Sequence, residues 1–227
     1  EMNAAYTGSE KFAPGKRFGF FPSFSVGWRI SEEPFLKKMQ ESWLTNLKVR
    51  YSYGEVGSDK GAPRFNYIQL FESGGNVTFG KNQNVSFGPL YTEGSLAYHD
   101  ATWETAVKQN LGIEMTLFRK LLASIDLFKE DRTGILMSRN SSAPWMGTGL
   151  PSVNIGKTKN HGLELELGWN DKVGKNFSYF AKFNFSTSEN RVVFKDDPNR
   201  LDDYLKAAGK PIGYVNKYLV SGNFGSI

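Results

Sequence analysis

The stretch GLELELGW, residues 162–169, alternates polar or small side chains with large apolar ones without exception. Glycine or glutamate occupies every even position, and a leucine or tryptophan occupies every odd position. Successive side chains of a β-strand point to opposite faces, so this pattern predicts a strand with one apolar and one polar face. The apolar face consists of Leu163, Leu165, Leu167 and Trp169.

Five further segments repeat this alternation and are also predicted to be strands. They are residues 23–30, 47–54, 103–118, 121–130 and 177–186. Segment 103–118 is much longer than the usual strand of about 5 or 6 residues in globular proteins. Consecutive alternating segments joined by tight turns pair as hairpins, so the predicted fold is all-β, an antiparallel meander of about six long strands.

Alternation does not decide whether the apolar face meets a protein core or lipid. The polar faces carry charges of both signs in mid-strand, which suits a water-filled lumen but also the solvent face of a soluble sandwich. If the sheet lies in a membrane, one set of residues faces lipid and the other faces the lumen. The lipid-facing set is Val49, Ile113, Ile125, Leu165 and Phe183, and the lumenal set is Arg50, Glu114, Asp126, Glu164 and Lys182.

The connections between the predicted strands alternate in length and favour the membrane. The shorter set is residues 31–46, 119–120 and 170–176, and the longer set is 55–102, 131–161 and 187–227. Membrane barrels have short periplasmic turns and long outer loops, whereas long loops are uncommon in compact soluble domains. A small hairpin of residues 66–71 and 76–79 is expected within the first long loop. Residues 31–42 resemble a short helix beginning at Ser31.

Composition excludes several classes of function. The 227 residues include no Cys and two isolated His, so disulfides, thiol chemistry and a His-rich metal cluster are not expected. The net charge of +5 is spread along the chain, which gives no footprint for nucleic acid. No apolar run is long enough for a membrane-spanning helix. The chain starts at Glu1, so we expect either that a signal has been removed or that the chain is a piece of a longer protein. Six strands are too few to close a barrel, which favours the piece.

Chemical sites are weakly supported by the sequence. Glu164 and Glu166 lie two apart on one strand face, about 6.6 Å at 3.3 Å per residue, which is near a glycosidase separation. Residues 194–203 hold four Asp without the order of a calcium loop. His99 stands beside Asp100 and near Glu104 without a nucleophile motif. We therefore expect no enzyme activity and no catalytic, cofactor-binding or metal-binding residues.

The aromatic residues have two interpretations. Tyr51, Tyr53, Trp103 and Trp169 could stack sugars, but an interfacial girdle at the rims of a membrane barrel is the favoured reading. Aromatic residues in the long loops are better candidates for contact with a substrate or a protein partner. These candidates are Tyr67, Phe71, Tyr91, Tyr98, Trp145 and Tyr214.

Five motifs stand in order along the chain. They are RFGFFPSFSVGWRISEEPFLK (17–37), LKVRYSYGEVG (47–57), TWETAVKQNLGIEM (102–115), DRTGIL (131–136) and VNIGKTKNHGLELELG (153–168), and AGKPIGY (208–214) follows them. Together they resemble the barrel of SusC/RagA-like TonB-dependent outer-membrane transporters. His161 departs from the Lys or Arg expected at its position.

The resemblance implies a barrel of about 22 strands that is closed by an N-terminal plug. It also implies a SusD-like surface lipoprotein as partner, energy from TonB, and uptake of glycan or peptide oligomers across the bacterial outer membrane. Residues 1–227 would form a middle portion of the barrel domain, without the plug, the TonB-contacting segment or the closing C-terminal strand. The alternative is a soluble β-sandwich that binds carbohydrate without catalysis.

Overall fold

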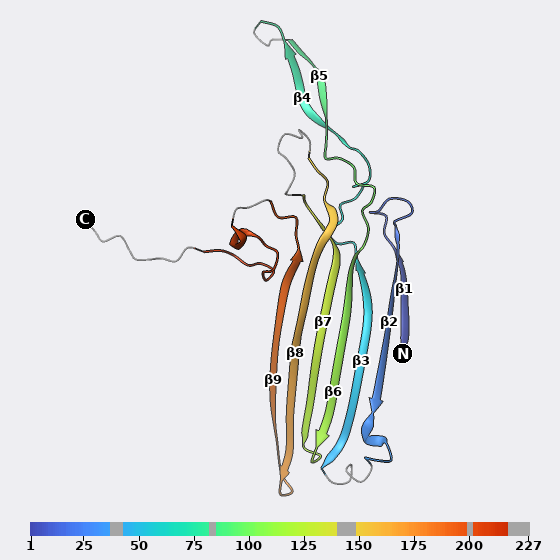
Figure 1. Cartoon of the computed structure of the whole chain (residues 1–227), viewed down its shortest axis with the longest axis vertical. Helices are drawn as coiled ribbons and strands as arrows, with labels where there is room; N and C mark the ends of the chain where they lie inside the picture. The colour runs from blue at the N-terminus through green and yellow to red at the C-terminus, as the bar shows by residue number, and fades with distance from the viewer. Residues whose placement is uncertain (37–42, 82–84, 140–148, 199–201, 218–227) are drawn as a thin grey trace, which may run out of the picture.

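The computed structural model describes residues 1–36, 43–81, 85–139, 149–198 and 202–217. Seven strands form one antiparallel sheet in the order β1-β2-β3-β6-β7-β8-β9, and β4 with β5 forms a separate hairpin beyond one end of that sheet (Figure 1). The strands are β1 Met2–Gly8, β2 Phe18–Arg29, β3 Leu44–Ser58, β4 Phe71–Phe79, β5 Val85–Glu93, β6 Glu104–Leu117, β7 Leu121–Met137, β8 Val153–Val173 and β9 Phe177–Phe194. Across these ranges no helix is long and apolar enough to cross a membrane.

The large sheet is a single layer. Among the described residues only five apolar side chains are buried, namely Phe12, Ala13, Leu44, Ala101 and Ala106. A β-sandwich would bury the inner faces of two packed sheets, with a buried side chain at every second position of most strands. The seven strands lie side by side with neither face covered by a second sheet (Figure 1), which does not fit the sandwich alternative.

The predicted meander is confirmed. Strands β6 and β7 pair from Leu117↔Leu121 onward, and β8 and β9 pair from Val173↔Phe177 onward, both antiparallel. The turn between β6 and β7 has positive φ at its two central residues, Phe118 (54°) and Arg119 (58°). Positive φ at both positions matches the right-handed twist of the flanking strands, so this turn fixes the register of the longest predicted strand.

The connections divide between the two ends of the sheet as predicted. The connections β2–β3, β6–β7 and β8–β9 lie at one end, which we call the turn end. The connections β3–β6 and β7–β8, together with the segment after β9, lie at the other, which we call the loop end (Figure 1). The hairpin β4–β5 projects from the loop end.

The strands extend further toward the loop end than the sequence predicted. The sequence pattern predicts a loop for residues 131–137 and 153–161, but both segments are paired parts of β7 and β8, and residues 187–194 continue β9. Strand β1 was missed altogether, although it pairs with β2 from Met2↔Phe24 to Gly8↔Phe18. The added parts of β7, β8 and β9 lack an apolar face that alternates with a polar one, because polar residues stand on both sides of the sheet there.

Two local predictions need correction. The hairpin in the first long connection pairs β4 (Phe71–Phe79) with β5 (Val85–Glu93), not residues 66–71 with 76–79. The pair Gly74 and Gly75 interrupts the register within β4, with φ of +93° at Gly75, and does not form the chain reversal. The predicted helix 31–42 begins as one 3-10 turn, η1 Ile30–Glu32, and residues 37–42 lie outside the described part.

Candidate functional site

One face of the large sheet carries a continuous apolar surface, which we call the apolar face. The ladders align Trp28, Val49, Ile113, Ile125, Leu165 and Phe185 in a single row across six strands. Phe183 lies in the next row, opposite Leu167. The five residues predicted to share a face therefore do so. Many of these side chains are exposed, including Trp28 at 51% and Phe183 at 55%.

The apolar surface crosses the sheet on a diagonal. On β2, the outward apolar side chains run from Trp28 toward the loop end as far as Phe18. On β9, they run from Phe185 toward the turn end as far as Phe177. Trp28 and Phe185 lie in the same row, so the band is displaced steadily from strand to strand. Strands that cross an apolar band obliquely are typical of membrane barrels, whose strands tilt about 35–45°.

The opposite face, which we call the polar face, carries a network of ion pairs. Arg50 on β3 lies 2.9 Å from a Glu114 carboxylate oxygen on β6 and 2.6 Å from Asp126 on β7. Lys48 lies 3.5 Å from the same Glu114. Gly112 stands between Arg50 and Asp126 in the row, and a Cβ there would lie 2.6 Å from Arg50 Nε, so the glycine leaves room for the guanidinium to bridge three strands.

A second group of ion pairs lies nearer the loop end. The Arg132 guanidinium is 2.7 Å from Glu104 and 2.8 Å from Glu130, and Lys108 is 3.5 Å from Glu130. Both groups are partly exposed to solvent. Cross-strand pairs of this kind remain hydrated, which is the arrangement expected for a water-filled interior.

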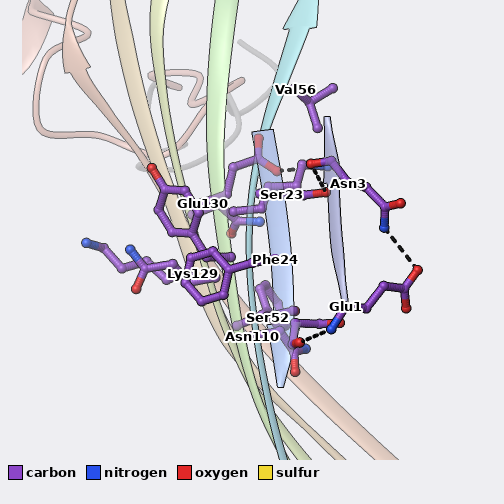
Figure 2. A pocket seen from close by; sticks show the side chains of 16 residues that line it. Glu1, Asn3, Ser23, Phe24, Ser52, Val56, Asn110, Lys129 and Glu130 are labelled. Carbon is purple, nitrogen blue, oxygen red and sulfur yellow. Dashed lines mark hydrogen bonds and ion pairs between the residues drawn. The ribbon is translucent and has the colours of Figure 1, made fainter. Parts of the chain in front are cut away.

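Between these groups a hollow of about 540 Å³ opens over β1, β2, β3, β6 and β7. Figure 2 shows it lined by Asn3, Ser23, Ser52, Asn110 and Glu130, among other residues. Hydrogen bonds within its wall join the Ser23 hydroxyl to Asn3 O and the Asn3 amide to Glu1 Oε1. Amides and hydroxyls of this kind can donate to and accept from a polar solute.

Glu164 and Glu166 also lie on the polar face, beside a smaller hollow of about 230 Å³. Across the ladders, Glu164 lies opposite Asp126 and Ser186. Glu166 lies opposite Ser124 and Asn184. Asp126 is neutralised by Arg50, whereas the two glutamates form no ion pair within the described ranges. Lys182 lies on the same face one row beyond, opposite Gly168.

The five loop aromatics that the structure describes do not form one site. Phe71 and Tyr91 both stand on the β4–β5 hairpin, where Phe71 faces Glu93 and Tyr91 faces Ser73. Tyr98 donates its backbone N–H to Asn66 O, which brings it beside the segment of Tyr67. Tyr214 lies elsewhere, under the Lys210 ammonium at 4.5 Å in the segment after β9. Trp145 lies outside the described residues.

The two carboxylates that stand near His99 in the sequence are bound to other residues. Asp100 lies 3.4 Å from Lys16, and Glu104 pairs with Arg132, so neither carboxylate is paired with His99.

Trp103 does not fit the girdle interpretation. Its ring packs against Phe12 and Phe21, and its indole N–H donates to Arg17 O, so it anchors the β1–β2 connection to the start of β6. Sequence reasoning missed this cluster because its members are distant in the chain.

A tilted single-layer sheet with one apolar and one ion-paired face defines the wall of a membrane-spanning antiparallel β-barrel. The chain belongs to the family described as TonB dependent receptor-like, beta-barrel, whose family model matches residues 3–226. This is a family of outer-membrane transporters.

Individual relatives agree with this assignment. The chain is 31% identical to TonB-dependent receptor P39 of Formosa agariphila over 96% of its own length and 20% of the relative. It is 26% identical to TonB-dependent receptor SusC of Bacteroides thetaiotaomicron over 90% of its length and 20% of SusC. The chain thus spans about a fifth of the curated relatives that it matches.

Solved structures show the same fold. The RagAB peptide importer in its open-open state superposes with a TM-score of 0.70 at 20% identity, over 97% of this chain and 21% of that one. The closed-closed state of the same importer gives a TM-score of 0.68 over 85% of this chain. The fold prediction of a partial transmembrane barrel is confirmed.

Proposed function

We propose that residues 1–227 form part of the barrel wall of a TonB-dependent outer-membrane transporter that imports glycan or peptide oligomers. The observation that carries the proposal is the wall itself, with its oblique apolar band on one face and its ion-paired, hollowed surface on the other. In this proposal a SusD-like lipoprotein is the surface partner and TonB supplies energy through parts of the protein outside this chain.

The orientation of the wall follows from the cost of burying charge in lipid. A Lys or Arg at the bilayer midplane on the lipid side of a barrel costs about 2–4 kcal/mol. The polar face carries Lys48, Arg50 and Lys182 at the level where the apolar face carries Val49, Leu165 and Phe183. The apolar face therefore meets lipid, and the polar face meets the lumen with Glu114, Asp126 and Glu164.

Cysteine labelling of the full-length transporter in intact outer membranes tests this orientation. Because residues 1–227 contain no Cys, single Leu165→Cys and Glu164→Cys variants can be compared directly, although any Cys elsewhere in the protein must first be replaced. A membrane-impermeant maleimide should label Glu164→Cys and leave Leu165→Cys unmodified. Strong labelling at Leu165 with none at Glu164 would reverse the two faces and overturn the proposal.

The loop end is proposed to lie outside the cell and to contribute to the seat for the lipoprotein and its ligand. In outer-membrane barrels the long connections are extracellular. The candidate contacts Tyr67, Phe71, Tyr91, Tyr98, Trp145 and Tyr214 belong to these connections. Aromatic platforms among Gly, Asn and Ser suit protein contact or sugar stacking.

Removal of residues 73–87 from the full-length transporter tests this seat, because the hairpin β4–β5 pairs with no strand of the wall. The barrel should still assemble, while co-purification of the lipoprotein or growth on the cognate nutrient falls. Matched deletions in the β7–β8 connection and after β9 complete the series. Unchanged lipoprotein recovery and growth in all three would place the seat elsewhere.

A further inference from the structure

The apolar face becomes charged where β7, β8 and β9 continue beyond the apolar band toward the loop end. The last apolar row on these strands contains Leu127 and Leu163. The next row is Lys129, His161 and Glu189, and the row after it is Asp131, Lys159 and Arg191. Alternation places all six side chains on the apolar side of the sheet, so they continue the surface that we assign to lipid.

These two rows hold three Lys and Arg side chains and two acids. Lys159 lies directly opposite Arg191. Like charges in opposite positions of adjacent strands are destabilising, so this placement is costly unless an anion lies between them. We call Lys129, Lys159 and Arg191 the cationic patch.

The two acids in these rows offset two of the three Lys and Arg charges and leave one positive charge in excess. Asp131 pairs with Lys129 at 2.7 Å within β7, and Glu189 pairs with Arg191 at 2.5 Å within β9. Lys159 is exposed and forms no ion pair with any described residue. Both acids are bound along their own strands, so within the described residues Lys159 between them has no carboxylate partner.

The patch is local and does not continue around the wall. At the loop end of β2 and β3 the outward residues include Phe18, Phe20, Tyr53 and the acid Glu55, and none of these is a cation. At the turn end, Lys120 is paired with Asp171 at 2.9 Å. An excess of positive charge next to the apolar band is thus confined to three adjacent strands, a width of about 10 Å at 4.8 Å per strand.

We propose that the cationic patch binds the phosphate of an anionic lipid headgroup in the outer leaflet of the membrane. The proposal rests on the orientation given above, which places residues just beyond the apolar band at headgroup level. There the stems of Lys and Arg lie along the apolar surface while their charges reach the headgroups. Arg191 contacts Glu189 through Nε and Nη2, and its remaining Nη–H groups can donate to phosphate oxygens. Lys159 adds a point charge from the adjacent strand.

Native mass spectrometry of the purified full-length transporter with added phosphatidylglycerol tests this inference. The double variant Lys159→Gln/Arg191→Gln removes two charges from the patch, and Lys182→Gln removes a charge of β9 that lies on the polar face. Bound phosphatidylglycerol should fall about tenfold or more in the double variant, since each cation near the headgroups strengthens binding roughly fivefold. The Lys182→Gln variant should bind as the unaltered protein does.

Three controls make the outcome decisive. The charge-preserving variant Lys159→Arg/Arg191→Lys should retain the lipid, which keeps the test valid if the neutral double variant assembles poorly. Phosphatidylcholine should not bind in a patch-dependent way. Inorganic phosphate at the same concentration should not displace phosphatidylglycerol, and complete displacement would show a free-anion site and overturn the lipid assignment.

Equal phosphatidylglycerol binding by the double variant and by Lys182→Gln would also overturn the inference. That failure is distinguishable from failure of the proposed orientation. If Leu165→Cys is protected from the maleimide and lipid binding is unchanged, only the patch assignment is wrong. If Leu165→Cys is labelled and Glu164→Cys is not, both are wrong.

Discussion

The seven-stranded wall and the β4–β5 hairpin are both antiparallel and rich in aromatic side chains, yet their geometry is set differently. In the wall, each of β2, β3, β6, β7 and β8 pairs along both edges. In the hairpin, two strands pair only with each other, and the register shifts twice. The large side chains Phe79 and Phe87 meet edge to face at 5.7 Å, and both are exposed. The position of an inner strand of the wall is therefore fixed by two neighbouring strands, whereas each strand of the hairpin is positioned by its single partner.

Introducing a charge should affect assembly of the barrel very differently in the wall and in the hairpin, and this is the largest effect that we expect. Leu165→Arg in the full-length transporter should destabilise the barrel by about 2–4 kcal/mol, because Leu165 lies in the central row of the apolar face. Phe87→Arg, at an exposed hairpin position, should leave assembly unchanged. The heat-modifiable folded fraction on gels of outer membranes measures both. Equal assembly of the two variants would contradict the lipid-facing assignment.

Adding a methyl group to a glycine should distinguish the regions by packing alone. A Cβ at Gly162 in β8 would lie 2.3 Å from Thr187 O and 2.5 Å from the Phe128 ring, whereas one at Gly88 in β5 would meet nothing within 4 Å. Gly162→Ala should cost about 1–3 kcal/mol because backbone and ring must both shift. Gly88→Ala should be neutral. Denaturant unfolding of the reconstituted transporter gives both values, and a neutral Gly162→Ala would show that β9 can move away from β8.

Removing an ion pair from the polar face of the wall should change the free energy of unfolding by a smaller amount. A double-mutant cycle of Arg50→Gln and Asp126→Asn should give a coupling of about 1 kcal/mol at most, since Arg50 is partly exposed and the pair is screened by water. High salt should reduce this coupling further. A coupling of zero at low salt would mean that Arg50 is held by Glu114 alone.

The smallest expected effect concerns the chain that leads from the wall to the hairpin. The Ser9 hydroxyl donates to Asp59 at 2.7 Å and Lys11 lies nearby, and together they hold the pKa of Asp59 below its ordinary value of 3.8 despite partial burial. Stabilisation of this contact is complete above pH 3.8 and is lost as the pH falls through the lowered pKa. Protease cleavage near residue 59 should therefore increase only in strong acid, and Asp59→Asn should remove that pH dependence.

The contrast between the wall and the hairpin also explains which parts of the structure could be predicted from the sequence. Six strands, their order and the tight β6–β7 turn were predictable because alternation persists wherever one face is apolar. The ends of β7, β8 and β9 were not, because Asp131, Lys159 and Arg191 make both faces polar there. In the hairpin, Gly74 and Gly75 resemble a turn but form a bulge. The ion pairs of Arg50 required the register, which no local pattern contains.

The tight β6–β7 turn also bears on the order in which the wall assembles. Pairing β6 with β7 closes only residues 118–120, whereas pairing β3 with β6 must first bring together the ends of residues 59–103. A connection about fifteen times longer adds roughly 2 kcal/mol of closure entropy. Hairpin formation takes about 1–10 μs in model systems, so β6–β7 and β8–β9 are the natural nuclei. The β3–β6 connection, which carries the hairpin, is then ordered last. Its sequence can change with little effect on the rate at which the wall forms.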